Sequence, residues 1–370
     1  MNIQLHRYYV QYFQNENGLR SMVIKFVKHL KDVMQHDKKT LKFKWMKCGL
    51  LQLSHRILFE PSSLTIFGKI NPSLLEKDFC LFDDNIHVFL ALLPDWIYRY
   101  FFRNILKARS RLNNSWLKDI NWHRIDECEF IQTRTDFIID HPEWFSEQDF
   151  AGAQTSLFWA SLGNTIPAVF WCFFYILQDS KAMKTIQEEI DIHLPQFSLD
   201  NDDENYDLIE QWTPERLNRC IYLDSAVNEV LRLTSAPMML RKCCQKTEVN
   251  LHDERILNVQ PNEAVALYPA ASHYDENQFS KSTIFIFDRF VHQNVETING
   301  FMPFGTGKSK CPGRFFAKYE MKICIAMFIR YVECKFLDTK IAPTQKAHRV
   351  GVGVAPPTQD LPIIYRYKNT

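Results

Sequence analysis

The sequence predicts a mainly helical protein with small β-sheets. Its 370 residues include 29 phenylalanines but only 11 glycines, a composition typical of helices packed around a large apolar interior. Apolar residues recur at helical spacing in several long segments, and one segment is apolar almost all the way round. Strand patterns separated by turn residues are short, as in residues 249–267. We therefore expect helices to enclose most of the core, and a chain of this length could be one large domain or two ordinary ones.

The composition excludes several classes of function. The charge is balanced, with 44 Lys and Arg against 43 Asp and Glu, so we expect no nucleic-acid partner. The ten cysteines contain no Cys-x-x-Cys pair and no regular spacing, which argues against a disulfide framework or a zinc site and fits a reducing compartment. There is no signal peptide, and the longest apolar run, residues 166–177, is too short to span a bilayer.

Residues 1–47 are predicted to form two helices, because apolar residues between Met22 and Met34 recur at helical spacing. This is also the most basic part of the chain. Two interpretations stay open for it: a solvated helix face, or a docking surface for an acidic redox partner or a membrane. The lysines concerned are Lys25, Lys28, Lys31, Lys38, Lys39, Lys42, Lys44 and Lys47.

Two apolar segments follow this basic region. Residues 49–69 predict a buried helix that Pro61 breaks. Residues 83–109 are rich in aromatic side chains, such as Trp96 and Phe101, and predict a pair of hydrophobic helices. Both segments add to the expected helical core.

A long central helix is predicted to begin after Ser146, which can form a capping box with the acid three residues on. Because residues 150–177 are apolar almost all round, this helix should run through the core. Pro167 has no N–H to donate to the carbonyl of Gly163, so we expect the helix to open there. The hydroxyl of Thr165 lies beside that gap. It could bond its own helix, or it could hold water and dioxygen.

A further helix is predicted from Pro214. It carries Glu229 and Arg232, a Glu-x-x-Arg pair that lies one turn apart on one helix face. Taken alone, such a pair is common and is usually an ion pair on the protein surface. The pair therefore predicts no function without further evidence.

Residues 301–319 read FMPFGTGKSKCPGRFFAKY and place Cys311 between a glycine-broken loop and a predicted helix. Pro312 suits the first helical position, and Gly313 has no side chain to keep a flat ligand from the backbone. Unpaired N–H groups at a helix N-terminus favour a thiolate. A thiolate on an open loop, beside the phenyl ring of Phe304, suits a haem iron as its ligand.

Two other interpretations of this segment were open on the residues alone. Cys311 could be no more than a small apolar residue in the core, as most single cysteines are. Alternatively, Gly307-Lys308-Ser309 ends like a phosphate-binding loop. That motif needs glycine in place of Met302, and Pro303 removes an N–H that phosphate would use, so the phosphate loop is excluded.

The spacing from Phe304 through Gly307 and Cys311 to Gly313 resembles the cysteine motif of the cytochromes P-450, the haem-thiolate enzymes. Ser309 stands where most members have an arginine that pairs with a haem propionate. The serine at this position and the residues around the cysteine both resemble the sterol 7-alpha-hydroxylase branch of that family. The motif is highly specific to the family.

The resemblance is strong over residues 146–370 and weaker over residues 1–145. It implies the haem-thiolate fold in a single domain, residues 1–370, with residues 146–370 as the haem-binding core and residues 1–145 as a partial N-terminal helical region. Members of the sterol branch also carry an N-terminal membrane helix, a proline-rich hinge and early helices and strands. None of these is recognisable here, so we expect an N-terminally truncated fold whose membrane anchor is missing.

The resemblance also implies roles for individual residues. The axial ligand of the iron of haem b would be Cys311. Other haem-binding residues would be Arg241, which would contact a propionate, together with Phe304, Gly307 and Gly313. The catalytic residues at the oxygen site would be Asn164 and Thr165. A buried network supporting the cysteine segment would consist of Glu229, Arg232 and Arg289.

The implied function is a monooxygenase that hydroxylates a sterol, most simply an oxysterol or cholesterol 7-alpha-hydroxylase. It would use O₂ and electrons from NADPH delivered by NADPH–cytochrome P-450 reductase. It would act at the cytosolic face of the endoplasmic reticulum membrane, with residues 83–109 over the substrate pocket and near the membrane surface. Three alternatives stay open: a sterol 12-alpha-hydroxylase, a haem-thiolate isomerase like prostacyclin synthase, and an inactive truncated chain.

Overall fold

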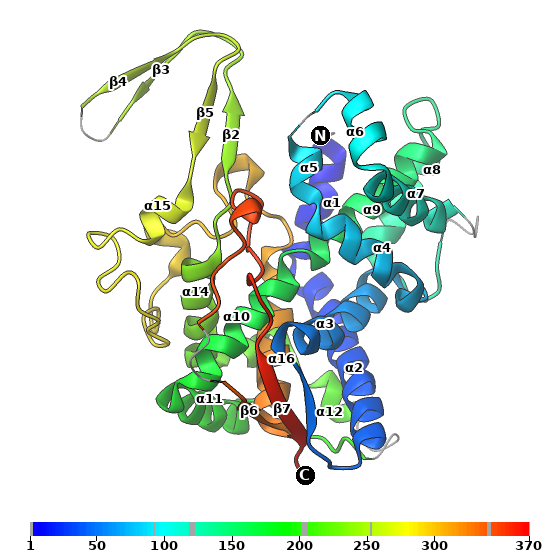
Figure 1. Ribbon diagram of the computed structural model, residues 1–370, viewed down its shortest axis with the longest axis vertical. Coiled ribbons are helices and arrows are strands. Elements are labelled where there is room, and N and C mark those ends of the chain that lie inside the picture. The colour runs from blue at the N-terminus through cyan, green and yellow to red at the C-terminus, as the bar shows by residue number, and fades with distance from the viewer. Residues whose placement is uncertain are drawn as a thin grey trace.

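The computed structural model describes residues 3–91, 93–117, 123–200, 206–251, 254–338 and 342–369. Helices make up most of the protein, and small antiparallel sheets lie at its edges (Figure 1). The prediction of a mainly helical fold with small sheets is confirmed. The α-helices in these ranges are α1 (Ile3–Phe13), α2 (Glu16–Leu41), α3 (Leu50–Phe67), α4 (Pro72–Asp84), α5 (Ile86–Leu90), α6 (Asp95–Phe101), α7 (Arg103–Leu117), α8 (Glu129–Ile139), α9 (Glu147–Leu162), α10 (Thr165–Gln178), α11 (Ser180–His193), α12 (Tyr206–Glu210), α13 (Pro214–Arg219), α14 (Ile221–Thr234), α15 (Pro269–His273) and α16 (Arg314–Tyr331).

The strands form three sheets within the described residues. A three-stranded sheet has the order β1-β7-β6 and joins chain segments far apart in sequence, with Met46 opposite Tyr365. Two hairpin-like pairs, β2 with β5 and β3 with β4, project together from the body of the protein (Figure 1). The strands are β1 (Met46–Gly49), β2 (Met239–Lys242), β3 (Thr247–Asn250), β4 (Ile256–Val259), β5 (Ala264–Leu267), β6 (Val332–Phe336) and β7 (Pro362–Tyr367).

The two helices predicted in residues 1–47 are α1 and α2. Asn15 caps α2, and the apolar side of α2 is buried against α3 and α16. Two of its lysines do not belong to a solvated face, because Lys31 and Lys38 are buried. The Lys38 ammonium lies 2.9 Å from the carboxylate of Asp200. The solvated-face interpretation is therefore wrong for these two lysines, which pack inside the fold.

Helix α3 is buried, as predicted, but Pro61 does not break it. The helix runs through the proline because it packs between α2 and α10, and this packing outweighs one lost hydrogen bond. Its N-terminus is capped from far away. Asp360 accepts hydrogen bonds from the N–H groups of Leu51 and Gln52, at 2.6 and 3.1 Å. Gly49 makes room for this carboxylate, since a Cβ there would lie 1.8 Å from Asp360 Oδ2.

The long central helix is present as α9 and α10, and it is interrupted at Gly163 and Asn164. Ser146 and Asp149 form the predicted capping box. The helix therefore opens close to the position that Pro167 predicts. Taken together, residues 147–178 are long and apolar enough to cross a membrane, in contrast to the prediction from uninterrupted runs, but 67% of the most apolar window is buried inside the fold.

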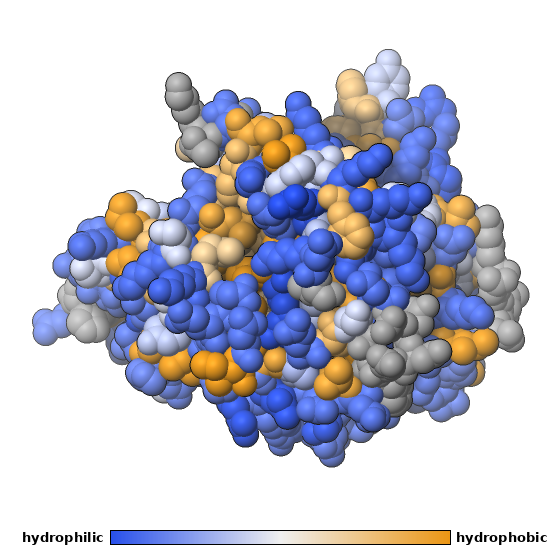
Figure 2. Space-filling model, turned by 90° about the horizontal axis from the view of Figure 1, so that it is seen from below, coloured by the Kyte–Doolittle hydropathy of each residue, from blue (hydrophilic) through white to orange (hydrophobic). Residues whose placement is uncertain are grey.

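Exposed large apolar side chains lie on the short helices α5 and α6, and the aromatic ones among them are on α6. Trp96, Tyr100 and Phe101 are each at least 65% exposed, and Leu90 is 58% exposed. Figure 1 shows α5 and α6 at the end of the molecule opposite the C-terminus. The face seen from that C-terminal end is mostly hydrophilic with scattered apolar patches (Figure 2). Large apolar residues are thus exposed together at α6 and the end of α5, and a second set is exposed on the projecting strands β2 to β5.

Candidate active site

The loop that carries Cys311 closes on itself before α16 begins. The N–H of Cys311 donates to the carbonyl of Phe304 over 2.9 Å. Gly305 and Gly307 between them have φ angles of +74° and +67°, which favour glycine. Pro312 was predicted at the first position of the helix, but α16 begins at Arg314, so Pro312 lies just before it. The loop is set by its own backbone bonds and two left-handed glycines.

The Cys311 thiol lies at the N-terminus of α16 in a half-buried position. Burial raises its pKa, while the backbone N–H groups of Gly313 and Arg314 and the charge of Arg314 act in the opposite direction. These N–H groups are the ones that a helix leaves unpaired at its start. The same groups can stabilise negative charge on the sulfur, as expected from the sequence.

A cavity of about 530 Å³ lies between Cys311 and the central helix. Cys311 and Gly313 line one side of it, and Leu157, Ala160 and Thr165 of α9 and α10 line another. Helix α1 and α16 also contribute to its walls. The cavity thus joins the two segments that the sequence assigned to a cofactor and to oxygen chemistry.

The two predicted catalytic residues do not share this cavity. Thr165 lines it, and its hydroxyl donates to the carbonyl of Ser161 over 2.9 Å, which is the simple back-bond considered from the sequence. Asn164 is held elsewhere: its Oδ1 accepts the N–H of Val354 over 3.0 Å. The carbonyl of Gly163 is occupied too, because Arg349 Nη2 donates to it over 3.1 Å. The expectation that Asn164 takes part in the oxygen site is therefore not supported by its position.

Arg241 does not reach the cavity. It lies on β2, in the projecting strands, where its side chain is exposed and donates to the carbonyl of Leu240. Phe304 lines a small space on the other side of the cysteine loop. The cations that line the cavity are Lys308 and Lys310, of which Lys310 pairs with Glu296. Lys308 is therefore better placed than Arg241 to meet a negatively charged edge of a ligand.

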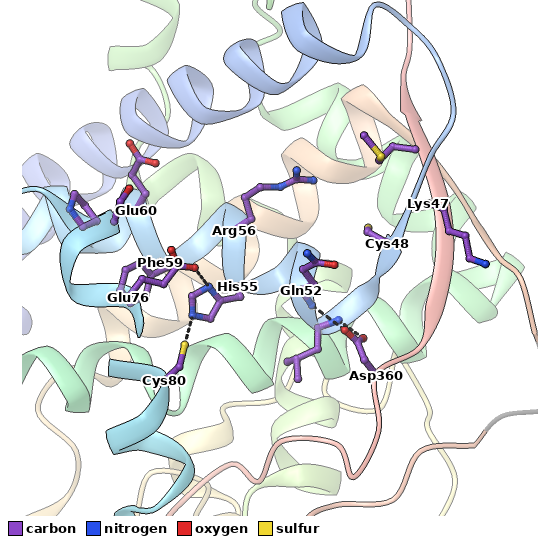
Figure 3. A pocket seen from close by; sticks show the side chains of 14 residues that line it. Lys47, Cys48, Gln52, His55, Arg56, Phe59, Glu60, Glu76, Cys80 and Asp360 are labelled. Carbon is purple, nitrogen blue, oxygen red and sulfur yellow. Dashed lines mark hydrogen bonds and ion pairs between the residues drawn. The ribbon is translucent and has the colours of Figure 1, made fainter. Parts of the chain in front are cut away.

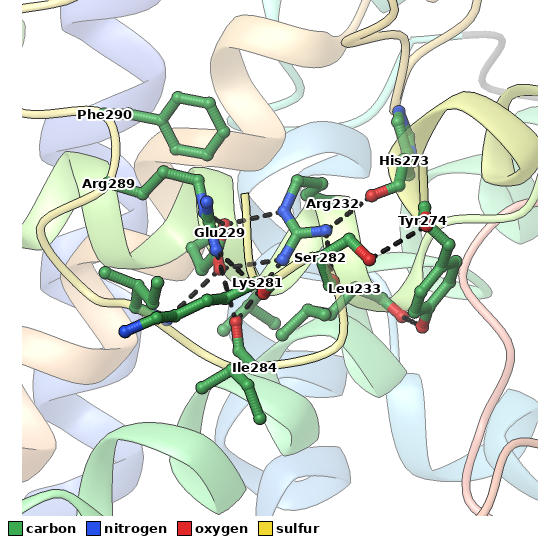
Figure 4. Close-up of polar contacts among 12 residues, drawn as sticks. Glu229, Arg232, Leu233, His273, Tyr274, Lys281, Ser282, Ile284, Arg289 and Phe290 are labelled. Atoms are coloured by element: carbon green, nitrogen blue, oxygen red, sulfur yellow. Dashed lines mark hydrogen bonds and ion pairs between the residues drawn. The ribbon is translucent and has the colours of Figure 1, made fainter. Parts of the chain in front are cut away.

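Glu229, Arg232 and Arg289 come together in one buried group (Figure 4). Glu229 lies between the two guanidinium groups, at 2.8 Å from Arg232 Nε and 2.9 Å from Arg289 Nε. The side chains of Glu229 and Arg232 are 0% exposed. The remaining donors of Arg232 bond the carbonyls of His273 and Ser282. Each charge has partners, which is the condition for burying it at tolerable cost.

This network is connected to the cysteine loop by two hydrogen bonds. His273, whose carbonyl binds Arg232, accepts the N–H of Met302 on its Nε2 over 2.9 Å. Ser235, at the end of α14, donates to the carbonyl of Pro303 over 2.7 Å. The buried charges thus hold the residues from which the loop to Cys311 departs.

His273 should make stability depend on pH. Burial, followed by the nearby charge of Arg232, lowers its pKa to about 4, whereas an unfolded histidine titrates near 6.5. Below pH 6.5 the unfolded chain gains a proton that the folded chain does not. Folding stability is therefore lost as the pH falls from about 6.5 to about 4, by roughly 3 kcal/mol for this group.

The test compares the wild type with His273→Gln, which keeps an oxygen that can accept the Met302 N–H. Denaturant unfolding at a series of pH values should show a steeper fall for the wild type between pH 6.5 and 4. Parallel curves for the two proteins would show that His273 is not held neutral.

Two cavity residues carry no signal that the sequence analysis used. Glu320, on α16, lines the cavity and accepts a hydrogen bond from Ser62, and burial raises its pKa to about 8. Tyr9, on α1, lines the cavity from the N-terminal side. The spacing of Gly313, Phe316 and Glu320, which places them on one face of the helix, could have indicated the glutamate. Nothing local to residues 1–13 indicates the tyrosine.

A second cleft, of about 680 Å³, shares no lining residue with this cavity. In it His55 lies between Glu76, 3.3 Å from Nδ1, and the thiol of Cys80, 3.5 Å from Nε2 (Figure 3). Burial and the neighbouring carboxylates raise the pKa of Cys80 to about 12. The thiol therefore stays protonated, and the cleft offers no activated nucleophile.

A family model described as Cytochrome P450 matches residues 4–363. The chain belongs to the cytochrome P450 family. Three curated relatives place it more closely. It is 31% identical to Cytochrome P450 7A1 of Oryctolagus cuniculus, over 88% of this chain and 68% of that protein. It is 28% identical to the 25-hydroxycholesterol 7-alpha-hydroxylase of Rattus norvegicus, over 88% and 80% of the two chains. It is also 28% identical to the 5-beta-cholestane-3-alpha,7-alpha-diol 12-alpha-hydroxylase of Sus scrofa, over 88% and 67%.

The cavity of this P450 fits the haem that the family implies. It has a single thiol, Cys311, directed at it from a helix N-terminus, and apolar walls on the opposite side. A Cβ on Gly307 or on Gly313 would meet no atom within 4 Å, so the backbone beside the thiol borders open space. A haem, which is flat and largely apolar, needs one thiolate ligand, an apolar wall and open space beside the sulfur. Cys311 would bind the iron, and Lys308 would face the polar edge of the group.

Proposed function

We propose that this P450 is a sterol monooxygenase, most simply one that hydroxylates cholesterol or an oxysterol at the 7-alpha position. The observation that carries the proposal is the single cavity that Cys311 and Thr165 share. The substrate class is supported by relatives at about 30% identity that are named for acting on cholesterol and 25-hydroxycholesterol. One oxygen atom of O₂ enters the sterol C–H bond to give an alcohol, and the other leaves as water with two protons and two electrons. The electrons come from NADPH through NADPH–cytochrome P450 reductase.

When bound through Cys311, a haem supplies the redox chemistry, and a thiolate ligand favours O–O cleavage. The remaining work falls to the chain's own residues. The N–H groups of Gly313 and Arg314 stabilise charge on the sulfur. Leu157 and Ala160 give the cavity an apolar wall, which suits a sterol.

Thr165 is the residue placed to handle a proton in this cavity. Its hydroxyl now donates to Ser161 O, and its two lone pairs stay available to accept from a water or another hydroxyl. A change of rotamer would free the proton for the cavity. Positioned proton transfer of this kind typically contributes about 10²–10⁴-fold to a rate.

The first test is turnover with a reductase and NADPH, using cholesterol, 25-hydroxycholesterol and 7-alpha-hydroxycholest-4-en-3-one as separate substrates. A 7-alpha-hydroxylated product from either of the first two supports the proposal. Product from the third alone would favour the 12-alpha-hydroxylase alternative, which relatives with that name support. Turnover of a prostaglandin endoperoxide without NADPH would favour the isomerase alternative. No product and no haem uptake would identify an inactive chain.

Thr165→Ala should separate electron use from product formation. NADPH consumption should stay close to wild type. Most of the electrons should end in hydrogen peroxide, because without the Thr165 hydroxyl the proton needed for hydroxylation is delivered more slowly. Thr165→Ser is the matched control, since it keeps the hydroxyl and loses only the methyl group. Product and peroxide are measured per NADPH. Equal coupling in the alanine variant and the wild type would show that Thr165 only packs.

We also propose that the protein works at the cytosolic face of the endoplasmic reticulum membrane. The support is the exposed aromatic group on α6 together with Leu90, because large apolar side chains gathered on one face are typical of contacts with a membrane or a partner. Helix α6 packs on α7, and α7 packs on the cavity-lining helix α9. Membrane contact at α6 would therefore bring a lipid-soluble substrate close to the helices next to the cavity.

A further inference from the structure

The interruption between α9 and α10 includes a backbone carbonyl, that of Gly163, whose usual helical donor does not exist in this sequence. Pro167 has no N–H, so the carbonyl of Gly163 lacks the donor that lies four residues on in an intact helix. Gly163 is buried, and a buried carbonyl without a partner costs folding free energy. Arg349 supplies the missing donor, because its Nη2 lies 3.1 Å from Gly163 O.

The charge of Arg349 is met by a carboxylate from a different part of the chain. Its side chain is 1% exposed, and its Nη1 lies 2.8 Å from Oδ1 of Asp83, at the end of α4. Trp159 Nε1 donates to the same oxygen over 2.8 Å. The group closes tightly around Gly163, since a Cβ there would lie 2.8 Å from both Asp83 Oδ1 and Trp159 Nε1. An arginine, a carboxylate and an indole thus converge on the interrupted turn.

The C-terminal segment that carries Arg349 also contacts the second residue of the interruption. The N–H of Val354 donates to Asn164 Oδ1 over 3.0 Å. Gly353 allows this approach, because a Cβ there would lie 2.3 Å from that oxygen. The segment is itself held by main-chain bonds between Ala236 and residues 351 and 353. Both residues of the interruption are therefore braced by one anchored segment.

Thr165 is the first residue of α10 and bonds back across the interruption to Ser161 of α9. Its direction in the cavity therefore depends on the geometry of the turn at Gly163. We propose that Arg349 is a positioning residue for Thr165: it holds the turn open by bonding the Gly163 carbonyl, while Asp83 holds Arg349 in place. This inference rests on the proposed function, in which Thr165 handles a proton.

Arg349→Lys is the test variant. Lysine keeps a positive charge opposite Asp83, but a single ammonium group cannot reproduce the fork that bonds Asp83 and Gly163 at once. Hydrogen exchange is measured on the purified haem-loaded protein for peptides that cover residues 159–171. We expect exchange there to be faster by roughly tenfold or more, the size expected for a lost charge-assisted hydrogen bond. The share of NADPH electrons that ends in peroxide should rise toward that of Thr165→Ala.

Lys346→Gln is the matched control. Lys346 pairs with Asp84 at 3.2 Å and so joins the same C-terminal segment to α4, but it donates to neither Gly163 nor Asn164. The control should exchange like the wild type over residues 159–171. A general loosening of the C-terminal segment would affect both variants, whereas the proposed role affects Arg349 alone.

If Arg349→Lys does not fold, Asp83→Asn takes its place, because the amide keeps an oxygen for Trp159 and removes the charge that holds Arg349. Faster exchange with raised peroxide supports the proposal in either variant. Wild-type exchange over residues 159–171, or faster exchange with no change in the peroxide share, overturns it. A wild-type enzyme that hydroxylates none of the three sterols defeats the proposed function, while exchange and peroxide from NADPH still decide the role of Arg349.

Discussion

Cys311→Ser is expected to abolish the red-shifted carbonyl band that a reduced haem-thiolate protein shows with carbon monoxide. A serine hydroxyl has the same connectivity as the thiol and is slightly smaller, and it does not ionise at neutral pH, so the iron would lose its anionic ligand. The N–H groups of Gly313 and Arg314 would then face a neutral oxygen in place of a thiolate. We expect complete loss of the band and of NADPH-dependent hydroxylation, measured by difference spectroscopy and product analysis.

Cys334→Ser is the matched control for this change. Cys334 is half-buried, like Cys311, but it lies on β6 and lines neither the cavity nor the cysteine loop. The control should keep a wild-type carbonyl band. If the band survives in Cys311→Ser, or disappears in Cys334→Ser, a different residue binds the iron and the assignment of this cavity fails.

The local parts of this structure could be predicted from the sequence, because their causes are local. The capping box at Ser146, the opening near Pro167 and the glycine-broken loop before Cys311 each depend on a few neighbouring residues. The strand β7 could not be predicted in this way. Its partner β1 is far away in the sequence, and its partner β6 is separated from it by a long loop.

The same distinction separates the right and wrong expectations at the site. Pro61 was expected to end a helix, but packing of α3 against α2 and α10 keeps the helix continuous. The sequence leaves the Gly163 carbonyl without a helical donor, and the donor that replaces it in the structure is Arg349, 186 residues away. The resemblance implied that Arg241 contacts a haem propionate, but its strand pairs with β5 and projects from the body of the protein. Side-chain partners that come from far along the chain leave no mark in a local pattern.

The buried network at Glu229 is where a single substitution should cost the most folding stability. Arg232→Ala removes two hydrogen bonds from the Glu229 carboxylate and the donors to the carbonyls of His273 and Ser282. A buried charge that loses its partner typically costs about 3–5 kcal/mol. The substitution should also loosen the cysteine loop, because His273, which Arg232 holds, accepts the N–H of Met302. We expect little folded, haem-loaded protein from this variant.

Lys184→Ala on α11 is the matched control for the network, because it also breaks an ion pair within one helix. Lys184 and Glu188 are one turn apart, 3.9 Å from each other, and 80% and 62% exposed, so water replaces the lost partner and stability should barely change. The measurements are the denaturant midpoint and the haem retained per chain for both variants. Arg232→Ala should lower both, and more strongly than any exposed pair can, since its missing partner lies where no water can replace it. If Arg232→Ala instead has a denaturant midpoint and haem content like those of Lys184→Ala, then water or Arg289 alone compensates the charge of Glu229. The cysteine loop would then not depend on Arg232.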